Sequence, residues 1–83
     1  MNLQGRVGLI TGAGQGIGRQ IALHFALNGA GGIVLNDVNA DRAEAVAKEV
    51  RALGCRAVAI AADVTDRAAV NDMVRRGAQE LGP

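Results

Sequence analysis

The residues best suited to chemistry lie in a glycine-rich segment, residues 11–18, with the sequence Thr-Gly-Ala-Gly-Gln-Gly-Ile-Gly. This segment follows an apolar run and precedes a helical pattern. A helix N-terminus carries about half a positive charge and unpaired N–H groups, so it attracts a pyrophosphate. Glycine lets the backbone approach phosphate oxygens, because a Cβ atom would hold them away. The segment therefore predicts a nucleotide site, and the alternative is a strand-to-helix turn without a ligand.

The spacing of these glycines separates the classes of nucleotide site. A Walker loop needs Gly-Lys-Ser/Thr, but the only lysine is the distant Lys48, so an NTPase is excluded. The pattern G-x-G-x-x-G fails because its last position is Ile17, and T-G-x-x-G-x-x-G fails because position 15 is Gln15. The pattern T-G-x-x-x-G-x-G fits, with its fixed positions at Thr11, Gly12, Gly16 and Gly18.

An acidic residue, Asp37, ends the second apolar run of the chain. A carboxylate at this place can accept hydrogen bonds from both hydroxyls of an adenosine ribose. It would repel the 2′-phosphate of NADP by about 4 kcal/mol per unit charge, at roughly 4 Å and an effective dielectric near 20. The sequence neighbours Asn36, Val38 and Asn39 supply no cation that could relieve this repulsion. Asp37 therefore predicts NAD rather than NADP, and the alternative is a capping acid before the next helix.

The elements that must position these residues are three β-branched apolar runs at 6–11, 33–36 and 57–61. None of them alternates cleanly between apolar and polar residues, which is typical of strands covered on both faces of a parallel sheet. Three segments between and after the runs carry apolar residues at helical spacing. The buried stripe of the first is predicted to be Ile17, Ile21 and Phe25. That of the second is predicted to be Ala43, Val46, Ala47, Val50 and Leu53. That of the third is predicted to be Val70, Met73, Val74, Gly77 and Leu81.

Polar residues and glycines mark the ends of these helical segments. Either Asn39 or Asp41 can cap the start of the second helix, and Gly54 lies where a helix-terminating C′ glycine belongs. The third helix is predicted to begin with Thr65 as its cap, followed by Asp66 as a first-turn acid.

The order β-α-β-α-β-α predicts an α/β fold with a parallel sheet. Right-handed crossovers would place the first two helices on one face and give the strand order 3-2-1, the N-terminal half of a doubly wound Rossmann sheet. Residues 1–83 would then form one partial domain, with a turn toward another strand at Pro83. The first strand would be an open edge, through which the chain could associate with a second copy.

The T-G-x-x-x-G-x-G loop and the later pair Asp63-Val64 give the chain a resemblance to the N-terminal third of the short-chain dehydrogenase/reductase family, over essentially all 83 residues. The resemblance implies that Gly12 makes the tight turn, that Gly16 and Ile17 present N–H groups to the cofactor, and that Gly18 permits close helix–strand packing. Gly14 also fits the pattern, without a specified role.

The same resemblance assigns the adenine end of the cofactor. It implies that Asp63 accepts a hydrogen bond from the adenine amino group, and that Val64 contributes a backbone contact and packing. The alternative is that Asp63 merely precedes a helix cap at Thr65. Gln15 stands where relatives that use NADP often carry a basic residue, which also favours NAD. The predicted cofactor-binding residues are Gly12, Gly14, Gln15, Gly16, Ile17, Gly18, Asp37, Asp63 and Val64.

The resemblance further implies an NAD(P)-dependent oxidoreductase that transfers hydride between nicotinamide and a hydroxyl/carbonyl substrate, with 3-oxoacyl (acyl-carrier-protein or CoA) reductases as the nearest expectation. The family's catalysis uses a tyrosine, the lysine of Y-x-x-x-K, a serine and an asparagine, and this chain has no tyrosine and no serine. We therefore expect no catalytic residue here and no hydride transfer by this chain alone. The alternatives are a stand-alone non-catalytic dinucleotide-binding module and a methyltransferase-type half that binds S-adenosylmethionine.

Composition excludes several other classes of protein. Of the 83 residues 49% are hydrophobic, which excludes a disordered tail. A net charge of +1 and a single aromatic residue, Phe25, provide no basis for binding nucleic acid or a membrane surface. No apolar run is long enough to span a membrane. The single cysteine, Cys55, cannot form an internal disulfide or a thiolate metal cluster, so we expect a reducing, cytoplasmic location and no metal.

Overall fold

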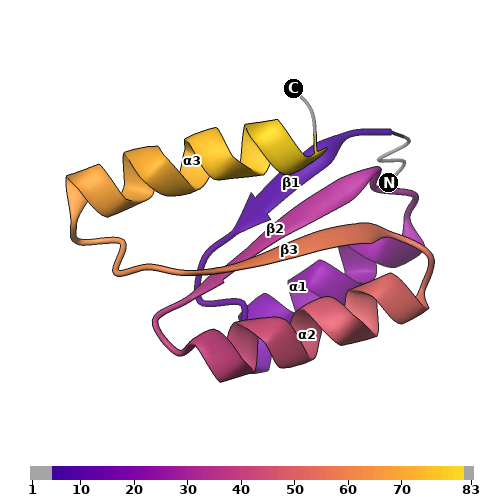
Figure 1. The fold of residues 1–83 in the computed structure, drawn as a ribbon. Coiled ribbons are helices and arrows are strands. Elements are labelled where there is room, and N and C mark those ends of the chain that lie inside the picture. The colour runs from indigo at the N-terminus through magenta and orange to yellow at the C-terminus, as the bar shows by residue number, and fades with distance from the viewer. Residues whose placement is uncertain (1–4, 82–83) are drawn as a thin grey trace.

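A computed structural model describes residues 5–81 and shows the predicted alternation of strands and helices (Figure 1). The six elements, in chain order, are β1 (Val7–Ile10), α1 (Gly16–Leu27), β2 (Gly32–Asp37), α2 (Ala40–Ala52), β3 (Arg56–Ala61) and α3 (Arg67–Leu81). The strands form one parallel sheet in the order β1-β2-β3. The predicted fold class and strand order are confirmed, while the turn expected at Pro83 lies outside the described residues.

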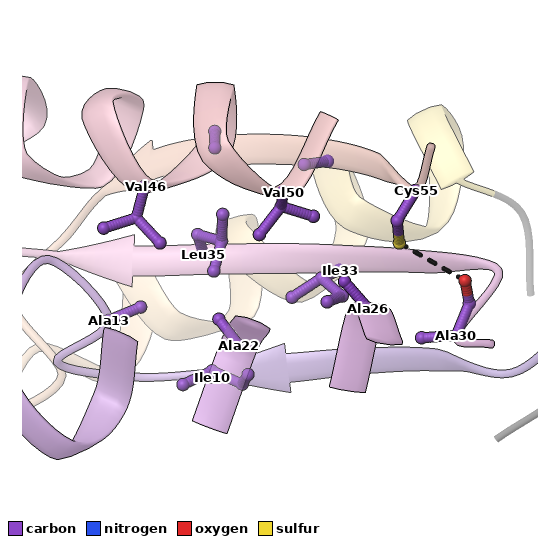
Figure 2. Packing of buried hydrophobic residues seen from close by; sticks show 12 residues of the cluster. Ile10, Ala13, Ala22, Ala26, Ala30, Ile33, Leu35, Val46, Val50 and Cys55 are labelled. Atoms are coloured by element: carbon purple, nitrogen blue, oxygen red, sulfur yellow. Dashed lines mark hydrogen bonds between the residues drawn. The ribbon is translucent and has the colours of Figure 1, made fainter. Parts of the chain in front are cut away.

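The helices lie in two layers on opposite faces of the sheet, with α1 and α2 on one face and α3 on the other (Figure 1). β2 lies in the middle of the sheet, and all six of its residues are buried. Figure 2 shows the core on the face of α1 and α2, where Ile33 and Leu35 of β2 lie against Val46 and Val50 of α2. Small residues of α1 complete this layer, so the helix packs close to the sheet.

The buried face of α1 differs from the predicted stripe. Ile17 is 79% exposed and Ile21 is also exposed, while Ala22 and Ala26 are buried against the sheet. Phe25 is only partly buried, where it packs against the core and lies beside Gly8 of β1. A hydrophobicity pattern ranks isoleucine above alanine, but the close approach of α1 to the sheet requires the smaller side chain. The prediction of an Ile17, Ile21 and Phe25 stripe was wrong for this reason.

The stripes of the two later helices are confirmed in most positions. Val46 and Val50 of α2 and Met73 and Leu81 of α3 are buried. At Gly77 a Cβ atom would lie 2.6 Å from Cγ2 of Val34, so glycine lets α3 approach β2. Two predicted members are exposed, Leu53 and Val74. Leu53 falls at the C-cap of α2, and Val74 borders the open hollow between α3 and β1.

The second face of the sheet is less completely covered than the first. A hollow of about 210 Å³ lies between β1 and α3, lined by apolar residues that include Leu9 and Met73. Leu9 is exposed, and within residues 5–81 β1 pairs on one side only, with β2. The expected coverage on both faces therefore holds for β2 and not for β1.

The ends of α2 and α3 show which residues cap them. Asn39 caps α2, since its side chain accepts the Arg42 N–H, and Gly54 follows the helix with φ +86° as predicted. The predicted Thr65 cap was wrong. Asp66 caps α3 by accepting the N–H groups of Ala68 and Ala69, because its carboxylate lies one residue nearer the helix. None of the helices among residues 5–81 is long and apolar enough to cross a membrane.

Candidate functional site

The candidate site lies where the three parallel strands end at their carboxyl termini. A hollow of about 290 Å³ opens there, lined by residues that follow each strand: Thr11 and Gly12 after β1, Asn36, Asp37 and Val38 at the end of β2, and Ala62 and Val64 after β3. Three residues predicted from the sequence, Gly12, Asp37 and Val64, are thus brought together. Ligands of open α/β sheets bind at this edge.

The glycine-rich segment turns through backbone conformations that suit glycine. Gly12 has φ +62° and Gly16 has φ +60°, a region that residues with a Cβ atom rarely adopt. At Gly18 a Cβ atom would lie 2.3 Å from the carbonyl oxygen of Gly12. Gly18 therefore lets the first turn of α1 lie directly on the loop, rather than on the strand as predicted. The loop is held to β2 because the Ala13 N–H donates to the Asn36 carbonyl at 2.8 Å.

The N-terminus of α1 has no side-chain cap. Gln15 lies at the N-cap position with extended backbone, its side chain makes no capping hydrogen bond, and the first turn holds no acid. The first N–H groups of a helix have no partner within the helix. At α1 neither a cap nor a carboxylate competes with an anion for these donors, so the loop residues and helix start can cradle a phosphate group.

Asp37 connects the loop to the start of α2. The residue is only 8% exposed, its Oδ2 accepts the Gly14 N–H at 3.0 Å, and its Oδ1 accepts the Asn39 N–H at 2.9 Å. Asn39 rather than Asp37 caps α2. Each carboxylate oxygen has a second lone pair, so Asp37 can still accept hydrogen bonds from a ligand's hydroxyl groups.

Gly14 acquires a role that sequence reasoning left unspecified. A Cβ atom at Gly14 would lie 2.6 Å from Oδ2 of Asp37 and 2.6 Å from Cβ of Arg42. Glycine is therefore required for the loop to contact both residues. The contact between the loop and Arg42 was not predicted, because the two are separated in the sequence. The helical pattern of residues 40–52 was the signal that could have placed it here.

Asp63 does not line the hollow, although it precedes Val64. Its Oδ1 accepts the Thr65 hydroxyl at 2.7 Å and the Thr65 N–H at 2.9 Å. These two hydrogen bonds, the hydroxyl's first, lower the pKa of the Asp63 carboxyl below its ordinary value. Asp63 thus makes a local turn before α3, and its contact with adenine stays a prediction.

Asn36 is a further site residue that the sequence did not reveal. It is buried at the end of β2, and its side-chain amide donates to the carbonyls of Ile60 and Ala62 at 3.1 Å each. This places the segment after β3 against β2 and so fixes Val64 at the hollow. A buried asparagine in an apolar strand is the one signal that could have indicated it. Within residues 5–81 no group of three or more His, Cys, Asp or Glu residues could hold a metal ion.

Comparisons with known proteins agree with this arrangement. The family model described as short chain dehydrogenase matches residues 6–83. A (2S)-[(R)-hydroxy(phenyl)methyl]succinyl-CoA dehydrogenase subunit of Thauera aromatica is 42% identical over 82 residues, 99% of this chain and 33% of that protein. The 7alpha-hydroxysteroid dehydrogenase of Escherichia coli K12 is 39% identical over 82 residues, 99% of this chain and 32% of that protein.

The similarity extends to solved structures. A 7 alpha-hydroxysteroid dehydrogenase complexed with NADH and 7-oxo glycochenodeoxycholic acid superposes with a TM-score of 0.92 at 40% identity, covering 98% of this chain and 31% of that one. A crystal structure of hydroxysteroid dehydrogenase from Escherichia coli gives the same TM-score of 0.92. The chain spans about a third of the length of the relatives that it matches.

Proposed function

This chain belongs to the short-chain dehydrogenase/reductase family, and from that premise we propose that it forms the part of an oxidoreductase that binds the adenosine and pyrophosphate groups of a nicotinamide dinucleotide. The observation that carries the proposal is the meeting of three groups at one edge of the sheet. They are the glycine loop with the uncapped start of α1, the Asp37 carboxylate, and the hollow between the ends of β2 and β3.

Each of these groups suits one part of the ligand. The N–H groups of Gly16 and Ile17 would bind the pyrophosphate oxygens, and Asp37 would accept from the ribose hydroxyls. Val38 is 75% exposed and Val64 is 49% exposed, and both border the hollow. Their side chains would pack on the adenine and bury apolar surface on binding.

We propose a preference for NAD over NADP at this site. The Asp37 carboxylate would repel a 2′-phosphate, and Gln15 in the loop is uncharged. The related 7 alpha-hydroxysteroid dehydrogenase carries NADH in its solved structure, which supports the same choice.

The complete protein would move hydride between nicotinamide and a hydroxyl/carbonyl pair of its substrate. This chain supplies no tyrosine or serine to handle the accompanying proton, so the reaction would depend on residues outside it. The names of the relatives include a CoA thioester, steroids and a dihydroxybenzoate. The narrower 3-oxoacyl substrate stays a prediction, and so does a cytoplasmic location.

Among residues 5–81 one edge of β1 has no paired strand, and this supports a proposal of self-association. Hollows of about 210 Å³ and 140 Å³ lie on either side of this strand, and Leu9 is exposed beside the first of them. A second copy that pairs its own β1 with this edge would satisfy the outer backbone groups. Sedimentation at several protein concentrations would show a dimer, and a strictly monomeric chain would contradict it.

Calorimetric titration of the chain with NAD, NADP and S-adenosylmethionine tests the principal proposal. We expect NAD to bind and S-adenosylmethionine not to bind. Asp37→Ala should weaken NAD binding by about tenfold or more, as for other hydrogen bonds to a charged group. Asp72→Ala, which removes an exposed carboxylate of α3, is the matched control and should have no effect. Binding of S-adenosylmethionine alone, or of no ligand by a folded chain, would contradict the proposal.

A further inference from the structure

β3 forms the edge of the sheet opposite to β1, because within residues 5–81 it pairs only with β2 (Figure 1). An edge strand presents backbone N–H and C=O groups on which a further strand can pair. The sheet therefore has two edges to which a second copy of this chain can add a strand. Whether β3 accepts such a strand depends on what its outer backbone groups contact.

Alternate residues of β3 direct their backbone groups to opposite sides of the strand. Directly after β3, the Ala62 N–H donates to the Asp37 carbonyl of β2 at 3.2 Å. The Ile60 carbonyl accepts from the Asn36 side chain of β2 at 3.1 Å. The even-numbered residues therefore face β2, and the odd-numbered residues direct their N–H and C=O groups along the outer edge: Ala57, Ala59 and Ala61.

Arg51 covers the first carbonyl of this outer edge. Its Nη2 and Nε both donate to the Ala57 carbonyl oxygen, at 2.9 Å and 3.2 Å. Its Nη1 donates to Oε1 of Glu44 at 2.8 Å, and this ion pair holds the guanidinium in place. The guanidinium thus occupies the position at which an added strand would place its own N–H group.

The space beside this part of β3 is bordered by charged side chains. A hollow of about 480 Å³ lies there, and Arg51 and Ala57 line it together with Arg56 and Glu80. A strand that paired at this edge would have to displace the guanidinium from Ala57 and bury charges that now contact water. Charged side chains at an edge oppose pairing with another strand for this reason.

The edge of β1 differs in charge from that of β3. The hollow of about 210 Å³ beside β1 is lined by apolar residues and glycines, and among residues 5–81 no charged side chain lines it. Leu9 is exposed there, and Arg6 lines only the smaller hollow of about 140 Å³ on the opposite face. The two edges of the sheet are therefore unequal, with β1 open to pairing and β3 covered at its amino-terminal half.

We propose that Arg51 blocks the outer edge of β3 against a second copy of this chain, so that copies pair through β1 alone. The proposal goes beyond the dinucleotide site and rests on the self-association proposed above. When one edge of a sheet is available, two copies form a closed dimer with two-fold symmetry. If β3 were also open, β1 of one copy would pair with β3 of the next, and this head-to-tail contact would repeat into an open-ended assembly.

Sedimentation velocity over a range of protein concentrations tests the proposal. The chains are the wild type, Arg51→Ala, Lys48→Ala and Arg51→Ala combined with Ala59→Pro. We expect the mean mass of the wild type to level off at twice the chain mass and that of Arg51→Ala to keep rising. Lys48→Ala removes the same charge from an exposed residue of α2, so it controls for net charge and should behave as the wild type does.

Ala59→Pro tests whether the assembly grows through β3. The Ala59 N–H faces away from β2, so proline removes no hydrogen bond of the sheet but blocks the outer edge. Added to Arg51→Ala, it should return the mean mass to that of a dimer, and circular dichroism verifies that each variant is folded. Amide hydrogen exchange measures the same edge without a further substitution, because the Ala59 N–H of Arg51→Ala should become protected as the assembly grows.

The possible outcomes distinguish this inference from the self-association on which it rests. If Arg51→Ala stops at the same mass as the wild type, or if the wild type itself exceeds a dimer, the blocking role of Arg51 is overturned. That role is also overturned if Lys48→Ala grows as Arg51→Ala does, or if Ala59→Pro leaves the growth unchanged in a folded chain. A strictly monomeric wild type would refute pairing through β1, while the role of Arg51 would stand if Arg51→Ala associates and Ala59→Pro reverses it.

Discussion

The junction between β1 and α1 and the junction between β2 and α2 connect the same kinds of element, but they treat the start of the helix differently. At α2 the side chain of Asn39 accepts a first-turn N–H, and Asp41 adds a negative charge to that turn. At α1 the N-cap residue Gln15 makes no such bond, and the first turn holds no acid. The backbone donors of α1 are therefore left for a ligand, whereas those of α2 stabilise the fold.

The two junctions also differ in the space that they leave for side chains. The third helical residue of α1 is Gly18, where a Cβ atom would lie 2.3 Å from a backbone oxygen. The corresponding residue of α2 is Arg42, which has room for a full side chain. The first turn of the helix must thus lie close to the loop backbone at the β1–α1 junction, which would hold a phosphate group. It need not do so at the β2–α2 junction.

The largest effect is expected from Gly18→Ala. The new Cβ atom would press on the Gly12 carbonyl, which cannot move as a flexible side chain could, and the free energy of unfolding should fall by about 2–3 kcal/mol. Urea unfolding followed by circular dichroism measures the change. Arg42→Ala at the equivalent position of α2 is the control and should change stability by less than about 0.5 kcal/mol. Equal stability of the two variants would contradict the close packing described for α1.

Giving α1 the cap that α2 already has would make the two junctions alike. Gln15→Asp should add about 0.5–1 kcal/mol to the free energy of unfolding, because its carboxylate can accept a first-turn N–H. The same carboxylate would occupy the donors that we propose bind the pyrophosphate, so NAD affinity should fall by about tenfold. Calorimetry and thermal unfolding of one preparation measure both effects. An unchanged affinity would show that the pyrophosphate does not bind at this helix start.

Removing the cap from α2 tests whether that helix depends on its N-cap side chain more than α1 does. Asn39→Ala should lower the free energy of unfolding by about 1 kcal/mol, since the Arg42 N–H loses its acceptor. Gln15→Ala removes no capping bond at α1 and should cost much less. Chemical unfolding of both variants gives the difference, and similar losses would mean that Gln15 stabilises its helix in another way.

The smallest effect concerns the junction before α3, where Thr65 donates to Asp63. The folded-state pKa of Asp63 lies below its unfolded value, so this contact stabilises the fold above about pH 4 and is lost as the pH falls through the lower, folded-state pKa. Thr65→Val removes the hydroxyl and should raise the Asp63 pKa, whereas Thr65→Ser should keep it low. NMR titration of the Asp63 carboxyl carbon measures this pKa. An equal pKa in the two variants would exclude the hydroxyl as its cause.

The sequence predicted the sheet and its strand order because long-range order in this fold follows from local patterns. β-branched runs such as 33–36 become strands, and right-handed crossovers with the first two helices on one face give the order β1-β2-β3. The meeting of the glycine loop and Asp37 at one edge of the sheet was also predictable, since each follows a strand and the carboxyl ends of parallel strands lie together.

The features that sequence reasoning missed depend on contacts between elements. The choice of Ala22 over Ile21 for the buried face of α1 is decided by how close the helix lies to the sheet. Arg42 lies beside the glycine loop because α2 folds back against it, and Asp66 rather than Thr65 caps α3 because its carboxylate lies one residue nearer the helix. These outcomes depend on distances that residue spacing alone does not contain.

The buried amide of Asn36 bears on the thermodynamics of ligand binding. By holding the carbonyl of Ala62, it immobilises the segment that carries Val64 when the chain folds. This segment is ordered before a ligand binds. Its loss of conformational entropy therefore contributes to the free energy of folding rather than to that of binding. The hollow at the ends of β2 and β3 would thus be preorganised for the proposed ligand, because Asn36 holds one of its sides by hydrogen bonds.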